Sequence, residues 1–226
     1  MTFTTLFRAW ATVLVAMLAA ILLTTAAFAT GAGAQPTCSG KVVLDPGHGG
    51  SDSGAVNTKY GLTEKEQTLD VAKRLEALLE EDGCTVYMTR TSNSQTLSNN
   101  DRYTYANTTG SRVLISIHMN GSTSPSTDYT TTLFGKWRKD KALASTVFSS
   151  LSNLPAANGT GTIATRTPYS FASGVLLKSD MPATIAETVF ITNDREGQLL
   201  SNGTGARQQQ IAQALRVGIE DYLSTP

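Results

Sequence analysis

The chain has 226 residues, enough for one well-filled domain and too few for a second of ordinary size. Its 18 basic and 18 acidic residues give a net charge of zero, which excludes the strongly basic surface that holds nucleic acid or anionic lipid by charge. We therefore expect a partner that is recognised by local chemistry.

The N-terminus has the pattern of a secretory signal peptide. Arg8 is the only charged residue up to Ala29, an apolar stretch follows it, and Ala27-Phe28-Ala29 has the small-x-small form of a cleavage site. Cleavage after Ala29 removes one basic residue and leaves a net charge of −1. The alternative is an uncleaved membrane anchor, since the apolar run is near the lower length limit for spanning.

These features divide the chain into a signal peptide at 1–29, a short linker at 30–39 and a functional domain at 40–224. We expect a protein secreted to the cell wall or periplasm, with no stable membrane association after cleavage. We also expect a monomer.

Two cysteines, Cys38 and Cys84, each stand just before a predicted strand, at 41–44 and 85–89 respectively. If one helix crosses over between these strands, the strands are parallel and their amino ends are neighbours. A disulfide between the two cysteines is then geometrically reasonable and suits an exported protein. Two free thiols are the alternative.

Strand and helix patterns alternate along the rest of the chain. Thr63 and Glu66 have capping-box spacing at the start of a helix that Asp82-Gly83 ends. The alternation predicts a single α/β domain with a mostly parallel central sheet flanked by helices. We predict further strands at 113–118, 129–134, 174–177 and 183–191, and helices at 64–81, 102–107, 141–151 and 208–223.

The only two histidines, His48 and His118, each follow an apolar run where a strand ends. The carboxyl ends of parallel strands line one edge of a sheet, where ligands bind. Two imidazoles at that edge suggest a metal site, although a loop histidine and a hydrogen-bonded strand-end histidine would have the same pattern. The carboxylates must decide between these interpretations.

Glu64 lies on the wrong face of its helix for a solvated residue. At 100° per residue it falls on the apolar stripe, which continues through Val71, Leu75 and Leu79. The other acidic residues of this helix fall on the opposite side. A carboxylate at the top of a buried face needs a partner, and this helix begins beside His48. A plain interaction with the helix dipole is the alternative.

Glu187 is the second unusual carboxylate. In the predicted strand 183–191, alternation places it on one face with Ile185, Val189 and Ile191. A glutamate flanked by apolar neighbours on a sheet face is costly unless it is paired or works as an acid or base.

Two histidines and one glutamate, plus a water molecule, form a standard catalytic zinc set. Such a zinc ion activates water and polarises a carbonyl, and a separate glutamate can pass the proton to a leaving nitrogen. Asp45 is an alternative ligand, but the tight Pro46-Gly47 turn favours a supporting role for it.

Five segments together resemble one family, the zinc-dependent N-acetylmuramoyl-L-alanine amidases of the amidase-3 type. The resemblance runs from about Lys41 to Tyr222 and is strong because the motifs occur in the family's order and spacing. The segments are Asp-Pro-Gly-His-Gly-Gly at 45–50, Glu-Lys-Glu at 64–66, Thr-Arg at 89–90, Ser-Ile-His-Met-Asn at 116–120, and 182–193.

The resemblance implies one Zn²⁺ ion held by His48, Glu64 and His118, with Glu187 as the catalytic glutamate. It also implies hydrolysis of the peptidoglycan amide that joins the lactyl group of N-acetylmuramic acid to L-alanine. Arg90 matches a family arginine for which a structural role is expected, and Asn120 and Asp45 are expected beside the ligands.

The chain departs from the family's pattern at Thr188-Val189 and at Met119-Asn120-Gly121, which puts substrate preference in doubt more than activity. Two other interpretations remain open. One is a non-catalytic wall-binding module that keeps the fold, and the other is a zinc peptidase that cuts an amide within the stem peptide.

Overall fold

The computed structural model describes residues 38–225, and a central sheet of six strands organises them. The sheet order is β4-β1-β5-β8-β6-β7, and every neighbouring pair is parallel except β6 and β8. The predicted mostly parallel sheet is therefore confirmed. The strands are β1 (Lys41–Pro46), β4 (Thr85–Met88), β5 (Val113–Asn120), β6 (Thr131–Phe134), β7 (Tyr169–Ser170) and β8 (Ala183–Phe190).

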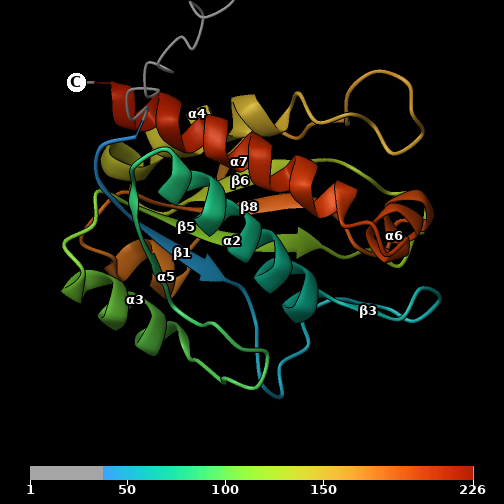
Figure 1. Cartoon of the computed structure of the whole chain (residues 1–226), viewed down its shortest axis with the longest axis horizontal. Coiled ribbons are helices and arrows are strands. Elements are labelled where there is room, and N and C mark those ends of the chain that lie inside the picture. The colour runs from blue at the N-terminus through green and yellow to red at the C-terminus, as the bar shows by residue number, and fades with distance from the viewer. Residues whose placement is uncertain (1–37, 226) are drawn as a thin grey trace, which may run out of the picture. The chain divides into compact units, whose positions relative to one another are not determined.

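Helices cover both faces of this sheet, as Figure 1 shows. One face packs against α2 (Glu64–Glu81), α4 (Trp137–Leu151) and α7 (Ala206–Ser224). The other packs against α3 (Asn99–Thr108) and α5 (Gly174–Lys178). Strands β1, β5 and β8 contribute buried side chains to both layers, which is why they read as almost continuous apolar runs. Within residues 38–225, none of the helices combines the length and the apolar character that crossing a membrane requires.

Three short features of the structure were not predicted from the sequence. The hairpin of β2 (Val56–Asn57) and β3 (Leu62–Thr63) leads into α2, and α6 (Asp194–Ser201) follows β8. The third is β7 itself. Two-residue strands and an eight-residue helix are too short to show a reliable period.

The predicted strand at 174–177 is wrong, because this segment is helix α5. Val175 and Leu176 are both buried while Leu177 is exposed, which a strand with alternating faces would not produce. A short apolar run cannot distinguish a strand from a buried helical turn by its period alone.

A register shift in β8 changes the face on which its last residues lie. His118 pairs with Glu187, but Asn120 pairs with Phe190, so β8 holds one extra residue between these pairs. Ile185 packs with the α3 and α5 layer, whereas Val189 packs with the opposite layer. Ile191 packs with that opposite layer too, so the predicted shared face of Glu187 holds for Ile185 and is wrong for Val189 and Ile191.

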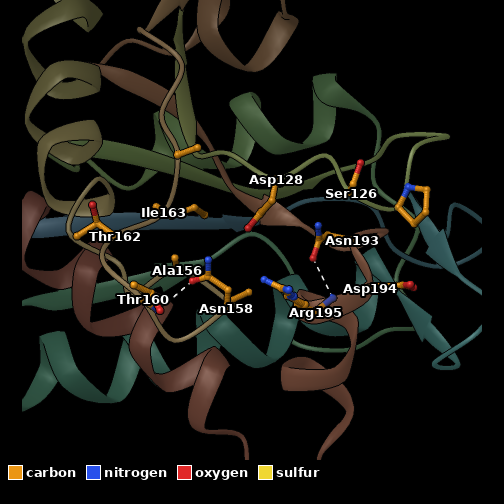
Figure 2. A pocket seen from close by; sticks show the side chains of 13 residues that line it. Ser126, Asp128, Ala156, Asn158, Thr160, Thr162, Ile163, Asn193, Asp194 and Arg195 are labelled. Atoms are coloured by element: carbon orange, nitrogen blue, oxygen red, sulfur yellow. Dashed lines mark hydrogen bonds between the residues drawn. The ribbon is translucent and has the colours of Figure 1, made fainter.

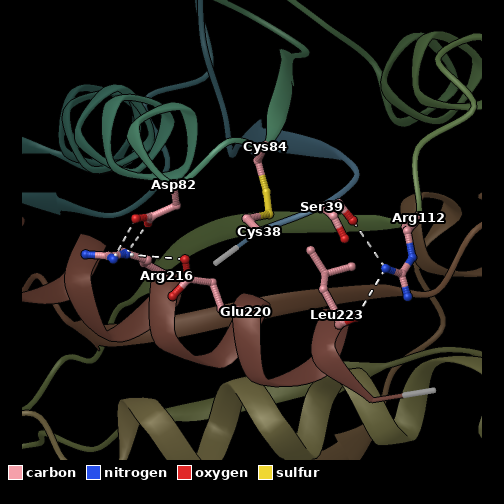
Figure 3. Close-up of a disulfide and its surroundings, with 8 residues drawn as sticks. All are labelled: Cys38, Ser39, Asp82, Cys84, Arg112, Arg216, Glu220 and Leu223. Carbon is pink, nitrogen blue, oxygen red and sulfur yellow. Dashed lines mark hydrogen bonds and ion pairs between the residues drawn. A yellow bond between two sulfur atoms is a disulfide. The ribbon is translucent and has the colours of Figure 1, made fainter. Parts of the chain in front are cut away.

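Cys38 and Cys84 form the expected disulfide, with their Cα atoms 5.2 Å apart. It joins the amino ends of β1 and β4 (Figure 3), at the edge of the sheet opposite the histidines. Below it, Arg112 Nη1 donates to the carbonyl of Leu223 at 3.1 Å and so ties the end of α7 to the same region.

Helix α2 begins and ends where predicted, but its capping differs. Thr63 is the N-cap residue, yet its hydroxyl donates to the Glu66 carboxylate at 2.6 Å and caps no backbone N–H. The predicted signal peptide, 1–29, lies outside the described residues, as does most of the predicted linker, 30–39.

Candidate metal centre

His48, Glu64 and His118 meet at the carboxyl edge of the sheet. His48 follows β1, Glu64 is the first residue of α2, and His118 lies near the end of β5. One ligand atom from each residue lies within 4.8 Å of the others. Glu64 Oε1 is 3.0 Å from His48 Nε2 and 3.0 Å from His118 Nδ1.

Backbone donors hold the Glu64 carboxylate in place. Oε2 accepts from the N–H of Ala55 at 2.8 Å, and Oε1 accepts from the N–H of Met119 at 2.9 Å. Burial raises the pKa of Glu64, but hydrogen bonds and charge from His118 and His48 outweigh it, so the pKa falls well below its ordinary value. Glu64 is therefore a fixed anion at the top of α2, as its position on the apolar stripe predicts.

Asp52 orients His48. His48 has a positive φ of 63°, and its Nδ1 lies 2.8 Å from Asp52 Oδ2. A proton on Nδ1 that is donated to Asp52 leaves the lone pair of Nε2 directed at Glu64 and His118. Burial lowers the pKa of His48, but Glu64 and Asp52 outweigh it and raise the pKa to about 8. No sequence pattern singled out Asp52, whose only signal is its place four residues after a strand-end histidine.

Two glycines leave room for the ligands. A Cβ at Gly47 would lie 2.4 Å from Cε1 of His118, and a Cβ at Gly54 would lie 2.5 Å from Oε2 of Glu64. Gly54 also has a φ of 64°, which a larger residue adopts with strain. Both positions therefore require glycine if the three side chains are to converge.

Glu187 faces the same cavity from β8. It pairs with His118 in the β5–β8 register, and the two line a cavity of about 460 Å³ together with His48 and Glu64. Burial raises the pKa of Glu187, and the charge of His118 offsets part of that rise. Among the described residues, no hydrogen-bond partner holds its carboxylate, which therefore stays available to a ligand in the cavity.

Asp45 is not placed to bind a metal, because its carboxylate is already satisfied. Oδ1 accepts from Arg102 at 2.7 Å and from Thr89 at 2.6 Å, and Oδ2 accepts from Ser116 at 2.7 Å. Burial raises the pKa of Asp45, but Arg102 and the two hydroxyls outweigh it and lower the pKa. Arg102, which the sequence patterns did not single out, also donates to the carbonyl of His48 at 2.8 Å.

Arg90 holds the same loop from the other side. It is 1% exposed and donates to the carbonyls of Pro46 at 2.9 Å, Gly47 at 2.8 Å and Lys65 at 2.7 Å. These contacts join the histidine loop to the first turn of α2. Asn120 lines the cavity, and its buried Nδ2 has no hydrogen-bond partner.

A second cavity, of about 600 Å³, shares no residue with the first. Figure 2 shows Asp128, Asn193 and Arg195 among the residues that line it, with Asn193 accepting from the backbone N–H of Arg195. None of the histidines or of the two glutamates of the candidate centre reaches it, so its size does not make it the site of the chemistry.

The fold and the donor set define a class of protein, an α/β domain with a His-Glu-His cluster suited to a metal ion and a second glutamate facing the same cavity. The model of the amidase-3 family, described as N-acetylmuramoyl-L-alanine amidase, matches residues 42–221. The chain belongs to this family.

Individual relatives agree with this assignment. A probable cell wall amidase LytH of Staphylococcus saprophyticus is 36% identical over 194 residues, which is 84% of this chain and 61% of that protein. LytH of Staphylococcus aureus is 33% identical over 185 residues, 81% of this chain and 58% of that protein. The chain thus spans about three fifths of the curated relatives that it matches.

Solved structures share the fold over most of their length. The amidase AmiC2 of Nostoc punctiforme has a TM-score of 0.72 and 31% identity, over 81% of this chain and 96% of that one. An N-acetylmuramoyl-L-alanine amidase from Clostridium difficile 630 has a TM-score of 0.73 and 31% identity, over 82% of this chain and 97% of that one.

Proposed function

We propose that this protein hydrolyses the peptidoglycan amide between the lactyl group of N-acetylmuramic acid and L-alanine. The observation that carries the proposal is the convergence of His48 Nε2, Glu64 Oε1 and His118 Nδ1 beside Glu187, in a member of the amidase family. These three atoms would hold one Zn²⁺ ion. A zinc ion bound there would acidify a water molecule and polarise the scissile carbonyl.

Other residues of the chain position the metal ligands and transfer the proton. Asp52 keeps the Nε2 lone pair of His48 directed at the metal position, and the N–H groups of Ala55 and Met119 keep the Glu64 carboxylate in place. Glu187 accepts the proton of the attacking water and delivers it to the nitrogen of L-alanine as the C–N bond breaks. Its raised pKa suits a group that must both take up and release a proton.

We propose further that residues 40–224 form the catalytic domain of a secreted, monomeric enzyme that works outside the cytoplasm. The Cys38–Cys84 disulfide supports an oxidising compartment, and the pattern of 1–29 supports export.

Digestion of purified peptidoglycan tests the reaction. The zinc-loaded protein should release stem peptides with a new L-alanine amino terminus, identified by mass spectrometry. Glu187→Gln should lower the rate by about 10²- to 10⁴-fold, because it removes the proton carrier. Glu80→Gln, on the exposed side of α2, is the matched control and should leave the rate unchanged. New termini within the stem peptide, or equal rates for Glu187→Gln and the wild type, would contradict the proposal.

Metal content tests the ligands independently of activity. The wild type should bind one zinc ion per chain by elemental analysis, and Glu64→Gln should lose most of it. Chelation should abolish hydrolysis, and added zinc should restore it. Full zinc occupancy in Glu64→Gln would show that Glu64 is not a ligand.

A further inference from the structure

Arg166 lies three residues before Tyr169 of β7, whose side chain lines the cavity. The backbone N–H of Arg166 donates to the carbonyl of Thr130 at 3.0 Å. The next residue, Thr131, begins β6 and pairs with Glu187 of β8. Neighbouring strands lie about 4.8 Å apart, so two steps across the sheet place the Arg166 backbone roughly 10 Å from that of Glu187.

Two tyrosines fix the Arg166 side chain. Nη1 lies 3.3 Å from the hydroxyl oxygen of Tyr129, to which it donates, and the guanidinium lies 4.7 Å from the ring centre of Tyr169. Tyr129 is itself anchored by edge-to-face packing on Phe190, with ring centres 4.6 Å apart. Tyr169 lines the cavity together with Glu187. Through Tyr169, the guanidinium lies next to the cavity before any ligand arrives.

The Arg166 side chain is exposed. No acidic residue among those described forms an ion pair with it. This distinguishes it from Arg102, which lines the cavity and is buried against Asp45. A planar guanidinium presents five N–H donors, and the contact with Tyr129 uses only one nitrogen. The remaining donors suit a carboxylate, which guanidinium binds in a two-pronged geometry.

We propose that Arg166, held by Tyr129 and Tyr169, is a subsite for a carboxylate on the stem-peptide residue that follows L-alanine. The inference rests on the proposed function, which places the scissile amide between the metal ligands and Glu187. L-alanine and the residue after it span about 7 Å when extended, which is comparable with the roughly 10 Å between the backbones of Arg166 and Glu187, so a carboxylate on the second residue reaches the Arg166 side chain. Arg166 then selects stems in which this group is a carboxylate over stems in which it is a carboxamide.

Competition between two soluble muropeptides tests the preference. The two differ only in a carboxylate or a carboxamide on the residue after L-alanine, and one digest of an equimolar mixture gives the ratio of the two freed stems. An exposed charge pair with defined geometry predicts that the wild type prefers the carboxylate by about fivefold. The preference should shrink in high salt.

Variants assign the preference to the guanidinium. Arg166→Gln should bring the ratio of the two freed stems to about one. Arg166→Lys should keep part of the preference, because the positive charge remains but the two-pronged geometry of the guanidinium is lost. Tyr129→Phe should reduce it less than Arg166→Gln. Arg195→Gln is the matched control, since Arg195 is an exposed arginine on the second cavity, and it should keep the wild-type ratio.

A binding measurement separates this inference from the proposed reaction. Calorimetry with Glu187→Gln should show tighter binding of the carboxylate muropeptide, and the double variant with Arg166→Gln should bind both equally. If the wild type frees neither stem but this binding preference persists, the proposed function fails and the subsite stands. Equal freeing or equal binding of the two by proteins that carry Arg166 overturns the subsite, as does a preference that survives Arg166→Gln.

Discussion

Arginines near the two walls of the cavity differ in burial and in their partners. On the histidine wall, made by the loop after β1 with α2 and α3, Arg90 and Arg102 are 1% and 6% exposed. Carbonyl oxygens and the Asp45 carboxylate surround them. On the tyrosine wall, where β6 and Tyr169 of β7 border the cavity, Arg166 stands beside the Tyr169 ring and is exposed, and within residues 38–225 its side chain has Tyr129 and Tyr169 as partners.

The difference shows how burial decides what a charge can do. A buried guanidinium must satisfy its donors within the protein, so it fixes the backbone that supplies the acceptors. An exposed one held by aromatic rings keeps donors free for a ligand. The strands that lead to the histidine wall, β1 and β4, are also joined by the disulfide at their far, amino ends, whereas the tyrosine wall ends in the two-residue strand β7. We therefore expect changes in the first wall to alter stability and changes in the second to alter substrate choice.

The largest expected loss of stability follows Arg102→Met. It leaves Asp45 buried without its cation, which should lower the free energy of unfolding by about 3–5 kcal/mol. Urea denaturation followed by circular dichroism measures it, with Arg166→Met as the control on the other wall. Equal losses in the two variants would remove the distinction between the walls.

Removal of the disulfide should have the next largest effect. The double change Cys38→Ser and Cys84→Ser opens a loop with a sequence separation of 46 residues and should cost about 2–4 kcal/mol. Hydrolysis below the unfolding temperature should persist, because the bond lies at the edge of the sheet away from the ligands. A folded variant of unchanged stability but lost activity would contradict this placement.

The stabilising contribution of Asp45, behind the histidine wall, should decrease at acidic pH. The pKa of Asp45 is lowered in the folded protein, so its stabilising contribution is complete above the unfolded value of about 3.9 and is lost as the pH falls through the folded value. The contribution is about 1.4 kcal/mol for each unit by which the folded pKa lies below the unfolded one. The destabilisation caused by Asp45→Asn should therefore shrink as the pH falls below about 3.9. Denaturant titrations at several pH values would reveal a constant difference if Asp45 did not titrate in this way.

The smallest expected stability change belongs to the tyrosine wall. Arg166→Gln should alter the free energy of unfolding by no more than about 0.5 kcal/mol, because the side chain is exposed and has no buried partner. Thermal unfolding of the variant and of Arg195→Gln measures this directly. A loss comparable to that of Arg102→Met would mean that Arg166 supports the fold.

Local patterns were sufficient where a single element decides a residue's surroundings. The 3.6-residue period placed Glu64 on the buried stripe of α2, and the apolar runs placed His48 and His118 at strand ends; the structure brings all three together. The position of Cys38 and Cys84 before two parallel strands likewise led to the observed disulfide. In each case the relevant partner lies at a predictable end of a regular element.

Patterns failed where a contact joins elements that are far apart in the chain. Nothing near Glu196 marks it, yet it is fully buried against Arg207. The extra residue in β8 reverses the face of Val189, and the segment at 174–177 is helical although its apolar run was assigned to a strand. Strand register and the packing of one layer on another set these features, and neither has a local sequence signal.

The sequence by itself therefore determined the alternating α/β plan, the strand ends that carry the histidines and the unusual burial of Glu64, because periodicity within one element is sufficient for each. Only the tertiary structure decided that Asp52 orients His48, that Arg102 neutralises Asp45 and that Arg166, with no acidic partner among the described residues, stands two strands away from Glu187. These relations depend on distances between elements, which arise when the chain packs around its core.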